Sequence, residues 1–183
     1  MTAGWWAAAP AADLSADAHL LHAIDGALAG TGRRAVLVQT HVDRRHVVAA
    51  TTVSWQLDGG GGEVEHDALA AALGGPVTQV DDGGAAGGAL VEAPRAGRLV
   101  RFPGSADVRG EVPVDRLLAR TAIDAVVGVG APVGPGDVVD TLDGHLRPQR
   151  RDGAVELLVE PSGPGRWRPV EIADPHRCCG GHA

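Results

Sequence analysis

The sequence of 183 residues contains no lysine, no asparagine and no tyrosine, and it has only one phenylalanine and one methionine. The absence of lysine excludes chemistry that needs a lysine Schiff base or the lysine of a phosphate-binding P-loop. The absence of tyrosine removes one common general acid. Alanine, glycine, arginine, proline and valine, whose codons are GC-rich, are abundant. The composition therefore indicates a bacterial genome of high GC content more than it indicates a function.

Positive charge is also scarce. The sequence has 16 basic residues, all of them arginine, against 23 acidic residues, which gives a formal net charge of −7. A nucleic-acid-binding surface needs a basic patch or stripe. The arginine pairs at 33–34, 44–45 and 150–151 fall in expected turns, where paired arginines are typically solvated. We therefore predict that nucleic acid is not a partner.

Long apolar runs are missing as well. No stretch approaches the ~20 consecutive apolar residues that a helix needs to span a membrane. The first 30 residues lack the positively charged start of a secretory signal, and Asp13, Asp17 and Asp25 interrupt their apolar residues. These features predict a cytoplasmic protein without membrane insertion, in which cysteines stay reduced.

The first part of the chain carries the patterns of two helices and a β-hairpin. Apolar residues at spacings of three and four predict a helix over residues 15–29. Residues 34–41 and 46–57 are rich in β-prone side chains and predict a hairpin. A short helix is expected over residues 65–73, and Gly74 and the residues after it should end this helix. A short strand is expected next, at residues 77–80.

The second part of the chain reads mainly as strands. Strands are expected at residues 89–93, 98–102 and 123–129, with a helix over 114–120. From residue 136 onward, turn signals separate short strands: Asp143-Gly144, Asp152-Gly153 and Ser162–Gly165. This spacing predicts a C-terminal β-meander of hairpin-connected antiparallel strands.

Taken together, these patterns predict an α+β fold, mainly an antiparallel sheet with two or three short helices. At this length one domain is expected, and we place it over residues 13–173, after a flexible lead at residues 1–12. Trp5 and Trp6 stand in that lead. Two indole rings would either fold back onto the domain or anchor a partner protein.

Several histidines have spacings that metal ligands use. His19 and His22 lie one turn apart on the polar side of the first expected helix, which predicts solvent-exposed side chains. His41 and His46 would flank the turn of the hairpin near Asp43, either as a metal or acid–base group or as a plain polar hairpin end.

The glycine-rich residues 128–136 superficially resemble a dinucleotide-binding loop. That loop must open a helix whose amides meet the pyrophosphate, and Pro132 and Pro135 leave no room for one.

The strongest concentration of chemistry is in residues 174–183, where both cysteines of the chain stand side by side with a histidine on each flank. His176, Cys178, Cys179 and His182 supply two thiolates and two imidazoles within seven residues. This is the donor set of a tetrahedral zinc site, and it also suits other borderline or soft metals. Structural zinc sites usually separate their cysteines by two to four residues, and adjacent side chains point in different directions in an extended chain. We therefore predict a metal site that a partner must complete.

Other interpretations of this tail stay open. Neighbouring Cα atoms lie about 3.8 Å apart, below the about 4.4 Å minimum of ordinary disulfides, so a disulfide between the two cysteines would be strained and would suit a redox switch. One cysteine could act as a nucleophile with His176 or His182 as its base, although catalysis needs held geometry. The tail could also be disordered, with incidental cysteines.

We therefore predict a non-enzymatic accessory protein or assembly subunit whose tail binds zinc or a related transition metal, shared with a protein partner or a second copy of the chain. The alternative is a metal-free structural or interaction subunit that docks through Trp5 and Trp6 and a sheet edge. An enzyme ranks third, because the sequence has no Gly-x-Ser-x-Gly, His-Glu-x-x-His or Cys-x-x-Cys motif.

Overall fold

The structure is a computed structural model, and it describes residues 4–11, 14, 16–43, 50–59, 63–80, 95–151 and 153–172. Its contacts group the chain into two compact units. Unit 1 comprises Met1–Phe102 with Arg150–Gly153, and unit 2 comprises Pro103–Gln149 with Ala154–Ala183. The single domain over residues 13–173 stays a prediction, because compact units can belong to one domain. None of the helices in the described ranges is long and apolar enough to cross a membrane.

Unit 1 combines two helices with antiparallel strands. Its elements are β1 (Trp5–Ala8), α1 (Asp17–Leu28), β2 (Ala35–Asp43), β3 (Ala50–Leu57), α2 (Glu63–Leu73), β4 (Thr78–Val80) and β5 (Gly97–Arg101). The strand order is β4-β1-β3-β2-β5, and every one of these pairs is antiparallel. Arg150 and Arg151 of β9 (Gln149–Arg151) also belong to unit 1, and β9 follows β5 in the order.

The predicted elements of this unit are largely confirmed. Both helices, the β2–β3 hairpin and the short strand β4 form where the sequence placed them, within two residues at most ends. The tip of the hairpin at residues 44–49 and the strand expected at 89–93 lie outside the described residues.

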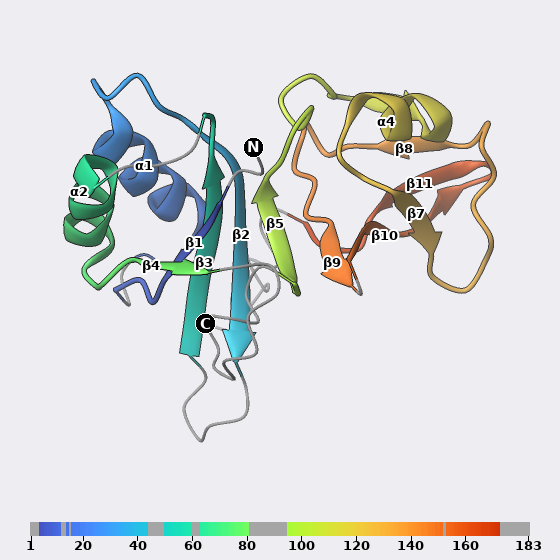
Figure 1. Ribbon diagram of the computed structural model, residues 1–183. Helices are drawn as coiled ribbons and strands as arrows, with labels where there is room; N and C mark the ends of the chain where they lie inside the picture. Colours follow the sequence, from blue (N-terminus) through green and yellow to red (C-terminus); the bar gives the residue numbers. More distant parts are fainter. Residues whose placement is uncertain are drawn as a thin grey trace, which may run out of the picture. The chain divides into compact units, whose positions relative to one another are not determined.

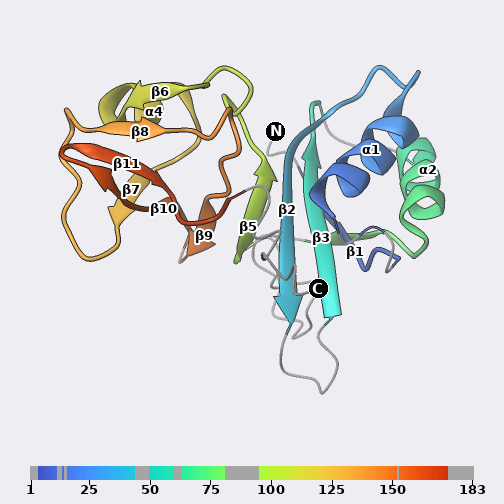
Figure 2. The same cartoon turned by 180° about the vertical axis from the view of Figure 1, so that it is seen from behind.

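The core of unit 1 lies between the sheet and its helices. Figure 1 and, from behind, Figure 2 show α1 and α2 on the same side of β1, β2 and β3. The apolar stripe of α1 is buried, as its spacing predicts. The buried cluster consists of Trp6, Ala8, Leu20, Ile24, Leu28, Ala35, Val38, Val53, Trp55, Leu57, Leu69, Leu73 and Val100. Two indole rings among mostly aliphatic side chains supply much of its apolar area.

The two adjacent tryptophans are part of the sheet. Trp6 pairs with Trp55 of β3, Trp5 pairs with Val80 of β4, and the two are only 8% and 5% exposed. The expectation that they fold back onto the protein is confirmed. For Trp5–Ala8 the expected flexible lead and the partner anchor are both wrong, because burial of two indoles outweighs the entropy lost when four residues join a sheet.

In the described residues, unit 2 consists of strands and one short helix. Its elements are β6 (Glu111–Pro113), α4 (Val114–Arg120), β7 (Ala125–Gly128), β8 (Val138–Asp140), β10 (Ala154–Gly163) and β11 (Arg166–Pro169). The β6–β8 and β10–β11 pairs are antiparallel, whereas the β8–β11 and β7–β10 pairs are parallel. The predicted helix over residues 114–120 is confirmed at both ends.

The fold-class prediction of an α+β protein with mainly antiparallel strands is confirmed. Within unit 2, the expected meander is right for the β10–β11 hairpin and wrong around β8. The turn at Asp143-Gly144 does form, with the Gly144 amide donating to the Thr141 carbonyl at 3.0 Å. However, β8 is paired on its two sides by β6 and by β11. The chain after that turn therefore has no free side of β8 to return to.

Candidate functional site

The four predicted metal ligands, His176, Cys178, Cys179 and His182, lie outside the described residues, so the metal site stays a prediction. The described chain ends at Ile172, just after β11. That strand is held in place through its tryptophan.

Asp137 anchors β11 and the loop before β8. Its carboxylate accepts hydrogen bonds from the Gly134 amide and from the Trp167 indole N–H, both at 2.8 Å. These two donors, the Gly134 amide first, hold the pKa of Asp137 below its usual value because they stabilise the charged form. The side chain is therefore an ionised structural anchor at neutral pH, and the tryptophan that it holds lies five residues before Ile172, the last described residue.

The histidines of the described ranges do not gather into a site, and no group of three or more His, Cys, Asp or Glu side chains there could hold a metal ion. His19 and His22 are exposed on α1, as predicted. His41 lies on β2 opposite Thr52, whose hydroxyl donates to the His41 carbonyl at 3.4 Å. His46 lies outside the described residues, so the hairpin cluster stays untested.

The glycine-rich residues 128–136 form bends and turns without a helix, as Pro132 and Pro135 predict. The loop thus lacks the helix N-terminus on which dinucleotide binding depends.

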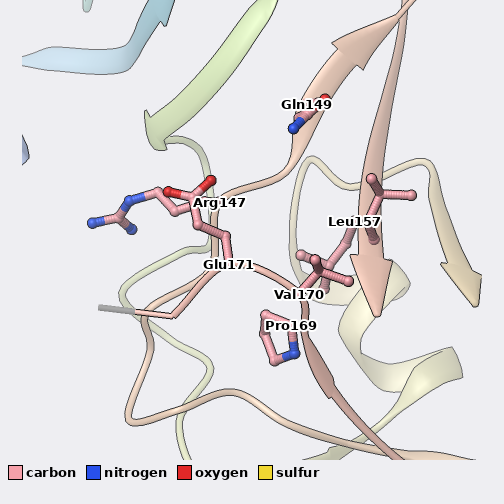
Figure 3. A pocket seen from close by; sticks show the side chains of 7 residues that line it. Arg147, Gln149, Leu157, Pro169, Val170 and Glu171 are labelled. Carbon is pink, nitrogen blue, oxygen red and sulfur yellow. The ribbon is translucent and has the colours of Figure 1, made fainter. Parts of the chain in front are cut away.

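A pocket of about 250 Å³ lies in unit 2 beside the end of β11. Figure 3 shows the side chains that line it: Arg147, Gln149, Leu157, Leu158, Pro169, Val170 and Glu171. The floor is aliphatic, and the rim carries one cation, one carboxylate and one amide. Gln149 comes from β9, Arg147 from the segment before it, and Glu171 from the residues just after β11 (Figure 3). A small apolar pocket with a few polar groups is a binding geometry. Among the described lining residues there is no nucleophile next to a base.

Two bidentate ion pairs join α1 to β5 in unit 1. Arg98 donates to both carboxylate oxygens of Asp17 at 2.7 and 2.8 Å, and Arg101 donates to both oxygens of Asp25 at 2.7 Å. The Arg101 hydrogen bonds, as the largest cause, lower the pKa of Asp25. Such fork-to-fork pairs add orientation as well as energy.

The spacing of these arginines explains why the sequence did not reveal the pairs. Residues 98 and 101 are three apart, so in a regular strand their side chains would point to opposite faces. The β2–β5 ladder is irregular: Val38 pairs with Arg101, whereas the next residue of β2, Gln39, pairs with Leu99. The extra residue in β5 acts as a β-bulge and lets both guanidinium groups reach α1.

A polar cluster occupies the middle of the unit 1 sheet. Gln39 of β2 and Ser54 of β3 are opposite each other in the ladder and fully buried. The Arg150 Nε donates to Gln39 at 3.4 Å, and its guanidinium lies 5.7 Å from the ring centre of Trp5. Among the residues that the structure describes, the Ser54 hydroxyl has no hydrogen-bond partner. Sequence patterning did not single out this cluster, because Gln and Ser in a strand are ordinarily exposed.

Comparison of the chain with protein-family models, with curated proteins and with solved structures finds no match. The functional argument therefore rests on the sequence and on the geometry of the described residues.

Proposed function

We propose that the protein is a non-enzymatic accessory protein whose C-terminal residues bind a borderline or soft transition metal, with zinc as the first candidate. The observation that carries this proposal is the presence of His176, Cys178, Cys179 and His182 within seven residues. Two thiolates and two imidazoles form the donor set that zinc prefers. Because adjacent cysteines diverge in an extended chain, the tail supplies two or three ligands, and a partner protein or a second copy of the chain supplies the rest.

The framework before the tail supports this proposal in two ways. The β10–β11 pairing and the Asp137–Trp167 hydrogen bond fix β11, the last described strand before the tail. Glu171, which lines the pocket, is only five residues before His176 in the sequence. A partner that completes the metal site can thus contact this pocket at the same time. The cytoplasm is the compartment that suits the function, because thiolate ligands must stay reduced.

Metal analysis of the full chain, purified under reducing conditions and dialysed after zinc loading, tests the proposal. We expect bound zinc in the wild type and its loss in the Cys178→Ser/Cys179→Ser variant. A His19→Ala/His22→Ala variant is the matched control, since it removes two exposed histidines from α1 and should keep the metal. The proposal is wrong if the wild type retains no metal, or if the cysteine variant retains as much.

A second candidate function, that of a metal-free interaction subunit, is favoured by β7. In the part of the chain that the structure describes, β7 pairs with β10 alone. Val127, in β7, and Val129, directly after it, are 37% and 53% exposed. Residues 125–136 contain no charged side chain. An uncharged edge strand with exposed valines is a template for strand addition.

Sedimentation of the full chain with and without a chelator separates the two functions. Association through β7 should persist in the chelator and be lost in Val129→Glu, while Val42→Glu, at another exposed valine, on β2 of unit 1, should leave it intact. Association that disappears in the chelator instead supports the metal-bridged assembly.

A further inference from the structure

A second pocket in unit 2 concentrates arginine side chains. It has a volume of about 140 Å³ and lies between α4 and the segment that leads into β6. Three arginines line it, Arg109, Arg116 and Arg120, together with two acids, Asp107 and Glu111. In a chain with a formal net charge of −7, three cations around one small pocket are a local reversal of sign.

Two of these arginines have unengaged guanidinium groups. Arg116 and Arg120 lie four residues apart on α4, so they stand one above the other on the same side of the helix. Val114 and Leu117 are buried on the other side of α4 and fix its orientation. Within the described chain, neither guanidinium makes a hydrogen bond or an ion pair. Both are therefore available to a ligand.

The third arginine is held in place by a turn. Arg109 donates from Nη1 to the Asp143 carbonyl at 2.6 Å, and the same Nη1 lies 3.7 Å from the Asp143 carboxylate. Leu142 and Asp143 adopt left-handed backbone angles, with φ of 48° and 58°, a conformation that persists only where the surroundings impose it. A guanidinium has five N–H donors, so this bond orients Arg109 and leaves donors free.

The acids of the pocket do not neutralise its arginines. Glu111 forms an ion pair with Arg166, which is not among the residues that line the pocket. Asp107, in the lining, and Asp143, whose carboxylate is 3.7 Å from Arg109 Nη1, are then the two acids that face three arginines. The balance of charge at the pocket is positive, and over the ~8–10 Å range of electrostatic interactions at ordinary ionic strength the pocket attracts anions.

We propose that this arginine pocket binds a phosphate group, either as inorganic phosphate or as the phosphoryl end of a small monoester. The planar guanidinium fork matches phosphate oxygens in pairs, and arginine is enriched wherever such recognition is needed. The volume suits an ion or one end of a ligand, since pockets for drug-sized molecules measure about 300–1,000 Å³. This site is independent of the metal-binding proposal, since the residues that define it lie between positions 107 and 120.

Titration of the full chain, followed by ¹H–¹⁵N NMR at constant ionic strength, tests the proposal. The probes are inorganic phosphate, phenyl phosphate and, as the anion that should bind weakly, acetate. We expect saturable shifts of amides within residues 107–120 for both phosphates, with phosphate binding at least tenfold tighter than acetate. Whichever phosphate binds more tightly identifies the free ion or the monoester as the physiological form.

The variant Arg116→Ala/Arg120→Ala should weaken phosphate binding at least tenfold, and its dispersed spectrum will show that it folds. Arg168→Ala is the matched control, because it removes another exposed arginine of unit 2, one that is paired with Glu160, and it should bind as the wild type does. The proposal is overturned if the shifts do not saturate, if acetate binds equally well, or if the double variant keeps its affinity.

Discussion

Unit 1 and unit 2 are stabilised by different kinds of interaction. Unit 1 packs two helices against its strands, and its buried cluster includes Trp6 and Trp55. In the described residues, unit 2 has one helix, of seven residues, where unit 1 has helices of 12 and 11 residues. Besides its own buried side chains, unit 2 has polar anchors such as Asp137 and turns with left-handed backbone angles.

The difference predicts where each unit is sensitive. A unit with a thick apolar core loses most stability when a large buried side chain is removed. A unit that depends more on turns with left-handed backbone angles loses most when such a turn can no longer adopt its conformation. The predictions below test this contrast.

The largest effect is expected from Trp55→Ala in unit 1. Trp55 is fully buried in the core cluster, and its truncation should lower the free energy of unfolding by about 3–5 kcal/mol. Leu157→Ala, at a buried position of β10 in unit 2, should cost about 2–3 kcal/mol, the low end of the range for leucine. Urea unfolding of both variants measures the difference. If Leu157→Ala is the more damaging of the two, the contrast between the units is wrong.

The next effect belongs to a turn of unit 2. Gly104 has φ of 80°, and a Cβ there would overlap the Arg120 carbonyl. Gly104→Ala should therefore destabilise by about 3 kcal/mol, from backbone strain and from overpacking. Gly110 has φ of 64° with open space around it, so Gly110→Ala should cost only about 1 kcal/mol. Thermal unfolding of the two variants side by side checks this, and equal losses would show that the close contact with Arg120 contributes nothing.

An effect of about 1–2 kcal/mol is expected for the Asp17–Arg98 pair of unit 1. Its side chains are 18% and 26% exposed, against 40% and 53% for the Glu160–Arg168 pair of unit 2. A more exposed pair is worth about 0.5 kcal/mol or less. Double-mutant cycles with Asn or Gln replacements measure both couplings. If the Glu160–Arg168 pair shows the larger coupling energy, the claim that the Asp17–Arg98 pair stabilises unit 1 is contradicted.

The smallest effect is a pH dependence shared by both units. The pKa values of Asp25 in unit 1 and Asp137 in unit 2 lie below 3.8 in the folded protein. A lowered pKa means that the stabilisation is complete above about pH 4 and is lost as the pH falls through the folded value. Asp25→Asn and Asp137→Asn should therefore be less stable than the wild type near pH 7, and the deficit should shrink below about pH 4. Denaturant unfolding at several pH values measures this, and a deficit that widens in acid would be inconsistent with it.

The elements of unit 1 were predictable because local periodicity decides them. The stripe of Leu20, Ile24 and Leu28 predicts α1 and its buried face from spacing alone. The pairing of β8 with β11 was not predictable in the same way, since it joins segments that are far apart in sequence and parallel. The turn signal at Asp143-Gly144 predicts a hairpin with β8. In the structure β6 and β11 occupy the two sides of β8, so that hairpin does not form.

The candidate sites also differ in whether their residues are close together in the sequence. The metal-binding pattern of the tail is visible in sequence because its four donors are close neighbours. The arginine pocket is not, because it needs Arg109 from a loop beside two residues of α4. The bidentate pairs also escaped prediction, since they depend on the irregular register of β5.

The most direct test of the central claim is titration of the reduced full chain with Co²⁺, followed by absorption spectroscopy. Thiolate coordination gives an intense near-ultraviolet charge-transfer band, and tetrahedral geometry gives visible bands. We predict both, with saturation at no more than one Co²⁺ per chain, bleaching by added Zn²⁺, and loss of the ultraviolet band in Cys178→Ser/Cys179→Ser. Spectra that stay those of the free hexaaqua ion at excess Co²⁺ would contradict the claim that the tail is a metal site.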